Sequence, residues 1–276
     1  MGKKFFCFGF VSVLTACLLI GWKRQTEPLV YYMTPCEKMD ITDILEMEEF
    51  GEKEYRILFF QTGLSRRAIE KLSDAQRNEI LMAAQEAFFS VPQIQCTRSS
   101  PLSWEEQNVG ECLPEFAGLE EGDILISFCS HILGWRNGHA AILVDAENGI
   151  TLEAVMLGED ACLQSLYKWQ TYPSFMVLRL KGQPSVVRRE IAQYAYQTMQ
   201  GLPYGFAQDL LEHFGIRLQK EDTDCSHLIW KAYMEFGFDL DSNGGIFVTP
   251  KDLSESPLLE IVQVYGINFD KIHESD

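Results

Sequence analysis

The spacing of apolar residues predicts a helical part of the chain followed by a mixed part. Within residues 25–117, apolar positions recur at helical spacing as far as Pro92, and Ser73 and Gln76 match a capping box that opens a helix. The apolar positions of this helix are Ile80, Leu81, Ala84, Ala87 and Phe88. We therefore expect a mainly helical extension over 25–117, which ends in a polar surface loop between Pro92 and Phe116.

From Gly118 onward the pattern indicates strands first and helices afterwards. Short apolar runs predict strands over 124–128, 139–145, 150–155 and 175–180, and Asn148-Gly149 is typical of a hairpin turn. Apolar stripes at helical spacing predict helices over 186–199, 205–214 and 225–236. Because strands and helices do not alternate strictly, this order favours an α+β domain over 118–276.

The first 24 residues have the pattern of an export segment. Lys3 and Lys4 precede an uncharged run of 18 residues from Phe5 to Trp22. This run fits an uncleaved membrane anchor, a lipoprotein signal ending at Cys17 or a cleaved signal peptide. Each alternative predicts export, and the anchor and the lipoprotein signal also attach the chain to the membrane, so we expect an extracytoplasmic, membrane-anchored protein of the bacterial cell envelope.

Composition indicates a folded protein and excludes some partners. Hydrophobic residues make up 46% of the chain, an ordinary globular value. Lys and Arg number 23 against 40 Asp and Glu, which gives a formal charge of -17. We expect no nucleic-acid partner, because a phosphate-binding surface needs positive charge. Outside the export segment, Cys96 and Cys112 bracket a polar loop, where a disulfide and two free thiols are both compatible with the sequence.

A nucleophilic thiol is the strongest chemical candidate. Cys225 lies at the first turn of a predicted amphipathic helix, directly after Asp224. Unpaired backbone N–H groups at a helix start stabilise an anion, so they favour the thiolate, which is the nucleophilic form. A buried structural cysteine is the alternative for this position taken alone.

A base and a carboxylate for this thiol are available on two neighbouring predicted strands. His139 begins one strand after Gly138, and Glu153 lies among apolar residues on the next. A hairpin would place the carboxylate beside the imidazole, where it fixes the tautomer and stabilises the cation. His227 is a poor base for Cys225, since positions i and i+2 point to different sides of a helix.

The order of these motifs resembles a known family. Gly122-Asp123-Ile124-Leu125, Gly138-His139-Ala140-Ala141, Thr151-Leu152-Glu153-Ala154, Val177-Leu178-Arg179-Leu180, Pro203-Tyr204-Gly205 and Asp224-Cys225-Ser226-His227 are similar to motifs of the YiiX-type permuted papain-like cysteine peptidases or amidases, which are related to the NlpC-type cell-wall peptidases. In the NlpC-type order Cys precedes His, whereas here His precedes Cys, as a circular permutation requires.

The resemblance implies a fold, a mechanism and site residues. The fold is a circularly permuted papain-like domain with an antiparallel sheet packed on helices. Cys225 is the nucleophile, His139 the general base and Glu153 the orienting residue, while Tyr204 stands where an oxyanion or substrate contact is expected. The implied reaction is hydrolysis of a peptide-like amide through a thioester, without a cofactor. The substrate is a small peptide, amide or acyl compound, and a cell-wall peptide is one candidate.

Two other classes of function remain open from the sequence. Lecithin retinol acyltransferase-like proteins share the permuted order and a Cys-x-His motif, so a lipid acyltransferase or acyl hydrolase is the first alternative. The second is a module without catalysis, which binds a ligand or zinc. Cys129-Ser130-His131 and Cys225-Ser226-His227 supply two thiols and two imidazoles, the number of ligands in a tetrahedral zinc site.

Overall fold

The computed structural model describes residues 31–34, 36–100, 103–132, 135–206 and 221–268. The predicted export segment and most of the predicted helix over 205–214 lie outside the described residues. Among the residues that are described, no helix has the length and apolar character needed to cross a bilayer.

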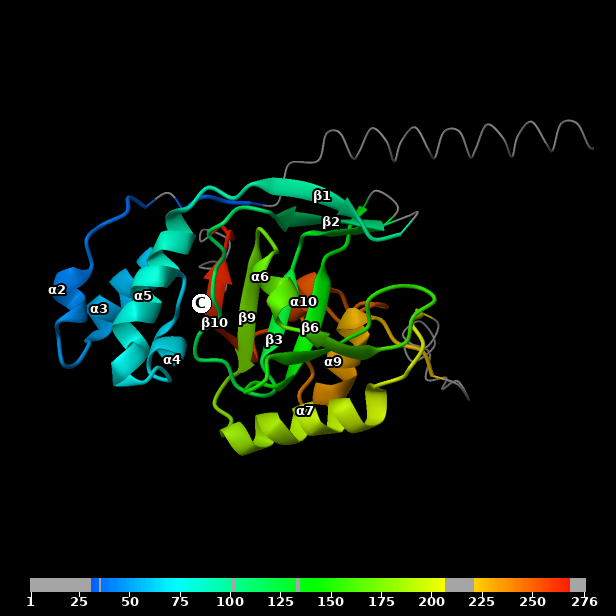
Figure 1. Cartoon of the computed structure of the whole chain (residues 1–276). Coiled ribbons are helices and arrows are strands. Elements are labelled where there is room, and N and C mark those ends of the chain that lie inside the picture. The colour runs from blue at the N-terminus through cyan, green and yellow to red at the C-terminus, as the bar shows by residue number, and fades with distance from the viewer. Residues whose placement is uncertain (1–30, 35, 101–102, 133–134, 207–220, 269–276) are drawn as a thin grey trace, which may run out of the picture.

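The N-terminal extension forms a layer of helices beside the sheets (Figure 1). These helices are α2 (Thr42–Leu45), α3 (Glu52–Thr62), α4 (Arg66–Ile69) and α5 (Asp74–Phe89). Helix α5 follows Ser73, but the predicted capping box does not form, because the Ser73 hydroxyl bonds the Gln76 side chain instead of a backbone N–H. The loop predicted over 92–116 contains two strands, β1 (Ile94–Arg98) and β2 (Ser103–Asn108).

The main sheet has six strands in the order β10-β9-β3-β6-β7-β8, and every neighbouring pair is antiparallel. Its strands are β3 (Ile124–Ser127), β6 (His139–Asp145), β7 (Ile150–Glu153), β8 (Cys162–Ser165), β9 (Phe175–Leu180) and β10 (Leu259–Tyr265). Strands β3, β6, β7 and β9 match the predicted runs, whereas β8 and β10 are additional. The α+β class predicted from the sequence is therefore confirmed.

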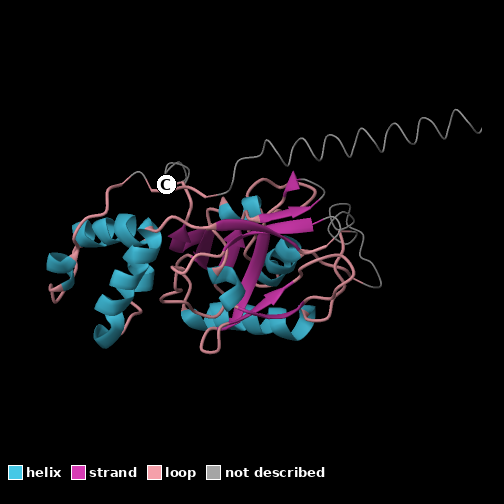
Figure 2. Cartoon of the chain, turned by 45° about the horizontal axis from the view of Figure 1, so that its top comes forward, coloured by secondary structure: helices cyan, strands magenta, loops and turns pink. Residues whose placement is uncertain are grey.

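Helices from the C-terminal half pack against this sheet (Figures 1 and 2). They are α7 (Ser185–Met199), α9 (Cys225–Met234) and α10 (Pro250–Ser254), and both α7 and α9 contact β6. The core lies at this contact, where Ile142, Ile191 and Ile229 are all fully buried. Burial of such apolar side chains is the main driving force for the packing. A short helix, α6 (Tyr167–Gln170), joins β8 to β9.

A second sheet has four strands in the order β1-β2-β4-β5, with β4 (Ser130–Ile132) and β5 (Trp135–Arg136). Its buried polar residues form a cluster in which Glu106 accepts hydrogen bonds from His131 at 3.1 Å and Arg136 at 2.9 Å. Trp104 stacks on His131 with ring centroids 5.0 Å apart. Strands β4 and β5 lie between β3 and β6 in the sequence, so this sheet directly precedes His139.

The helical extension is attached to the open edge of the main sheet. The Val264 N–H donates to the Gly63 carbonyl, and the Ser65 N–H donates to the Val262 carbonyl, at 2.9 Å each. The chain before α4 therefore pairs with β10. An unpaired strand edge is prone to association with other chains. The extension therefore covers an edge that would otherwise be open.

A buried ion pair joins two of the sequence motifs. The Arg179 guanidinium donates to both Asp123 oxygens, at 2.7 and 2.6 Å, and also to the Gly118 carbonyl at 2.8 Å. Burial raises the pKa of the Asp123 carboxyl, although hydrogen bonds and the charge of Arg179 act in the opposite direction. This pair links β9 to the start of β3.

We expect Arg179→Met to destabilise the fold by about 3–5 kcal/mol, because it leaves the Asp123 carboxylate buried without its partner. Urea denaturation at neutral pH measures this loss. Arg66→Met is the control, because the ion pairs of Arg66 with Glu52 and Glu70 are on the surface. Loss of these surface pairs should leave the unfolding midpoint nearly unchanged. Equal midpoints for the two variants would contradict a structural role for the Arg179–Asp123 pair.

Candidate active site

The structure brings Cys225, His139 and Glu153 together at one end of the main sheet. Cys225 is the first residue of α9, His139 the first of β6 and Glu153 the last of β7. The His139 ring donates from Nε2 to Glu153 Oε2 at 2.7 Å, and Cys225 is near enough to help raise the pKa of the imidazole. Because Nε2 is engaged by the carboxylate, Nδ1 is the ring nitrogen left to the thiol.

Local backbone geometry sets the position of His139. Gly138 has a φ of 75°, and a Cβ at this position would lie 2.8 Å from the Ser127 carbonyl oxygen. Glycine therefore permits the turn that starts β6 beside β3, where His139 is the register partner of Ser127. The β6–β7 hairpin then returns the chain so that Glu153 reaches the ring.

The start of α9 is capped by a carboxylate that does not compete with the thiol. Asp224 accepts hydrogen bonds from the backbone N–H groups of Ser226 at 2.8 Å and His227 at 3.1 Å. Such a cap stabilises the helix start by about 1 kcal/mol. Cys225 is 7% exposed and is therefore one of the buried residues of the core.

Charge is concentrated in the pair formed by His139 and Glu153. Burial opposes the charged form of His139, but hydrogen bonds to Cys225 and Glu153 and the charges of both groups raise the pKa of the imidazole to about 10. Burial likewise opposes ionisation of Glu153, whereas His139, Lys168 and Thr151 lower the pKa of its carboxyl to about 2. The arrangement therefore favours a His139 imidazolium beside an ionised Glu153 carboxylate.

Tyr204 lies close enough to Cys225 for the two groups to interact electrostatically. Burial raises the pKa of its phenol, and the negative charges of Cys225 and Asp224 raise it further. Tyr204 therefore remains protonated at neutral pH, so it can donate a hydrogen bond. Its ring also packs edge-on against Phe206 at 5.4 Å, which is consistent with a structural role as well.

Two residues that sequence reasoning missed complete the surroundings of Glu153. The Thr151 hydroxyl donates to Glu153 Oε1 at 2.6 Å, and the Trp169 indole N–H donates to the same oxygen at 2.7 Å. Thr151 precedes Glu153 by two positions on β7, so the alternation of a strand was a usable signal. Trp169 comes from α6, a helix too short to be predicted from its pattern.

The other Cys–His motifs are engaged elsewhere. The His227 ring bonds the Thr223 hydroxyl at 3.1 Å, and the Cys129 thiol bonds Ser174 at 3.5 Å. Burial raises the pKa of Cys129 to about 11, so this thiol stays protonated. In the part of the chain that the structure describes, no group of three or more His, Cys, Asp or Glu side chains is arranged to hold a metal ion. The six cysteines in this part are all free, Cys96 and Cys112 included.

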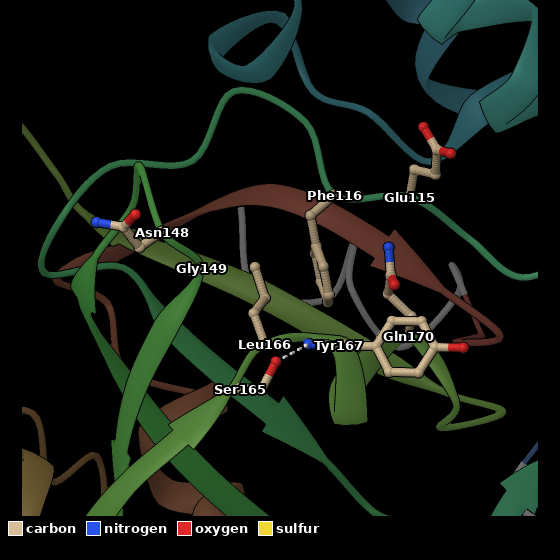
Figure 3. A pocket seen from close by; sticks show the side chains of 8 residues that line it. All are labelled: Glu115, Phe116, Asn148, Gly149, Ser165, Leu166, Tyr167 and Gln170. Carbon is tan, nitrogen blue, oxygen red and sulfur yellow. Dashed lines mark hydrogen bonds between the residues drawn. The ribbon is translucent and has the colours of Figure 1, made fainter.

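A cavity of about 340 Å³ lies beside α6 and the turn before β7 (Figure 3). It is lined by Gly149, which precedes β7, and by Tyr167 and Gln170 of α6. Phe116 and Leu166 also line it. Since Glu153 is at the opposite end of β7, this cavity is separate from the Cys225 thiol.

Comparisons with known proteins give one structural match. No protein-family profile matches the chain, and no curated protein does. The chain is similar to the crystal structure of metalloprotein yiiX from Escherichia coli O157:H7, with 18% sequence identity and a TM-score of 0.40. The match covers 52% of this chain and 96% of that one.

Proposed function

We propose that the protein is a thiol hydrolase that cleaves a peptide-like amide bond through a thioester on Cys225. The observation that carries this proposal is the hydrogen bond between the His139 imidazole and the Glu153 carboxylate, with Cys225 close enough to influence the pKa of the same imidazole. A nucleophile, a base and a group that orients the base are the parts that acyl transfer requires. The order of the motifs supports assigning the domain to the permuted papain-like fold.

Each of the three residues has a defined part in the reaction. The Cys225 thiolate attacks the substrate carbonyl carbon and forms a tetrahedral oxyanion. The His139 imidazolium then gives its proton to the leaving amine as the C–N bond breaks, which leaves an acyl thioester. Neutral His139 next takes a proton from water, the resulting hydroxide attacks the thioester, and the carboxylic acid leaves as the thiolate reforms. Glu153 holds the ring and stabilises its cation throughout.

Two donors are available for the oxyanion. Asp224 accepts from the backbone N–H groups of Ser226 and His227 but not from that of Cys225. The Cys225 N–H, at the positive end of α9, is therefore placed beside the carbon that the thiolate attacks. Tyr204 is the second donor, because its hydroxyl remains protonated close to Cys225.

The proposal extends to the place where the enzyme acts. The export pattern of residues 1–24 supports a membrane-attached protein of the cell envelope, with residues 25–117 as an extension before a catalytic domain over 118–276. A small peptide or amide is the proposed substrate, and a cell-wall peptide suits this location. The proposed chemistry requires no cofactor.

Screening the full-length protein against peptides, simple amides and lipid acyl esters tests this function. We expect release of an amine from at least one amide, together with an intact-mass increase equal to the acyl group at short times. Hydrolysis of lipid esters without any amide would favour the acyl-transferase alternative. Complete absence of an acyl-enzyme and of product, from folded protein, would count against a thiol hydrolase.

A further inference from the structure

Trp169 makes two contacts with the proposed site from a helix outside the sequence motifs. Its indole Nε1–H donates to Glu153 Oε1 at 2.7 Å. Its ring also stacks on the His139 imidazole, with centroids 5.5 Å apart and an interplanar angle of 17°. The Trp169 side chain is fully buried, so both contacts lie in a region from which water is excluded.

The two oxygens of Glu153 have different partners. Oε1 accepts from Trp169 and from Thr151, whereas Oε2 accepts from the His139 ring. A carboxylate has enough lone pairs for all three donors. With Oε1 held by two donors, rotation of the carboxylate is blocked and Oε2 stays directed at His139.

Helix α6 is fixed in turn by the second sheet. Tyr172 packs edge-on against Trp169 at 5.3 Å, and its hydroxyl donates to Glu105 Oε1 on β2 at 3.1 Å. Lys168 lies 3.4 Å from the same carboxylate. A chain of contacts therefore runs from β2 through α6 to Glu153.

We propose that Trp169 is a positioning residue, which holds Glu153 and His139 in the orientation that keeps Cys225 reactive. This inference rests on the proposed thiol hydrolase function and adds a positioning residue to it. The contacts of Trp169 with the site are to Glu153 and His139, so it acts through the carboxylate and the imidazole. The indole N–H stabilises the ionised carboxylate, and the stacked ring restricts the tilt of the imidazole.

The charged surroundings of Glu153 are consistent with this role. His139 and Lys168 favour its ionised form, and Thr151 supplies a neutral hydrogen bond. Tyr172 is also close, and the charge of Glu153 helps to raise the pKa of this phenol. Loss of the indole donor should therefore destabilise the ionised form of Glu153 and, through it, the charged form of His139.

The rate of Cys225 alkylation by iodoacetamide, measured from pH 5 to 10 in the full-length protein, tests the proposal. We expect Trp169→Phe to slow alkylation at neutral pH by roughly 10- to 100-fold, the range expected for loss of a hydrogen bond to a charged group, and to shift the profile to higher pH. Hydrolysis of the amide found by the substrate screen should fall in parallel. Replacement of Trp169 by benzothienylalanine keeps the ring but lacks the N–H, so it tests the donor even if Trp169→Phe does not fold.

Trp230→Phe is the matched control, because the Trp230 indole also donates to a carboxylate, that of Asp239 at 2.8 Å. This variant should keep the alkylation profile of the wild type. An unshifted profile in the folded benzothienylalanine variant would overturn the role of Trp169, provided that Glu153→Gln does shift the profile. If Glu153→Gln also leaves the profile unchanged, the proposed triad itself fails, so the two failures are distinguishable.

Discussion

Replacing Cys225 with alanine is expected to lower amide hydrolysis by on the order of 10⁴-fold or more while leaving the fold intact. The reason is that the proposed reaction forms a covalent bond to the thiol, so no other residue can replace it in that step. Helix α9 keeps its Asp224 cap in this variant, so loss of one sulfur atom should leave the helix in place. Initial rates measured with the substrate from the screen give the effect directly.

Cys129→Ala is the matched control for this experiment. Cys129 is fully buried, and burial raises the pKa of its thiol to about 11, so this thiol should neither react nor contribute to turnover. Iodoacetamide at neutral pH should accordingly label Cys225 faster than Cys129. Retention of full activity in Cys225→Ala would exclude the thioester mechanism, and equal labelling of the two cysteines would argue against an activated thiol.

The sequence predicted those parts of the fold that have regular periodicity. The runs over 139–145 and 175–180 correspond to β6 and β9, and the helix begun by Cys225 corresponds to α9. These segments are regular because each buries one side or both sides in a single core. The juxtaposition of His139 with Glu153 was also open to prediction, since a two-strand hairpin places its ends side by side.

Other elements lack such a signal. Strands β1 and β2 contain Gln, Thr, Arg and Glu residues, and several of these side chains remain exposed, so their composition is typical of a loop. Their hydrogen bonds come from pairing with each other and with β4, which depends on the fold of distant segments. Strand β10 is different, because its apolar residues are typical of a strand although it is not among those predicted.

Trp169 shows why the surroundings of a site are harder to predict than its central residues. Its indole bonds a carboxylate 16 positions earlier in the chain, and its ring lies on an imidazole from another strand. A lone tryptophan in a four-residue helix carries no spacing that indicates either contact. Only the packing of α6 against β2 and β7 reveals them.

Glu153→Gln is expected to lower turnover by about 10²- to 10⁴-fold without unfolding the protein, because an amide nearly matches the carboxylate in size. The amide cannot supply the charge that stabilises the His139 imidazolium, and it can favour the wrong tautomer of the ring. The neutral thiol–imidazole form should then replace the ion pair at neutral pH. The pH at which Cys225 alkylation accelerates should therefore move upward.

The pH dependence of stability provides a second measurement on the same variant. In the folded protein the pKa of Glu153 is lowered from 4.5 to about 2, so its contribution is present above pH 4.5 and is lost as the pH falls towards 2. The pKa of His139 is raised from 6.5 to about 10, so its contribution is complete below pH 6.5 and is lost as the pH rises towards 10. The difference in unfolding free energy between wild type and Glu153→Gln should consequently be largest between pH 4.5 and 6.5. A difference that is constant from pH 3 to 10, together with unchanged turnover, would show that Glu153 is not coupled to His139.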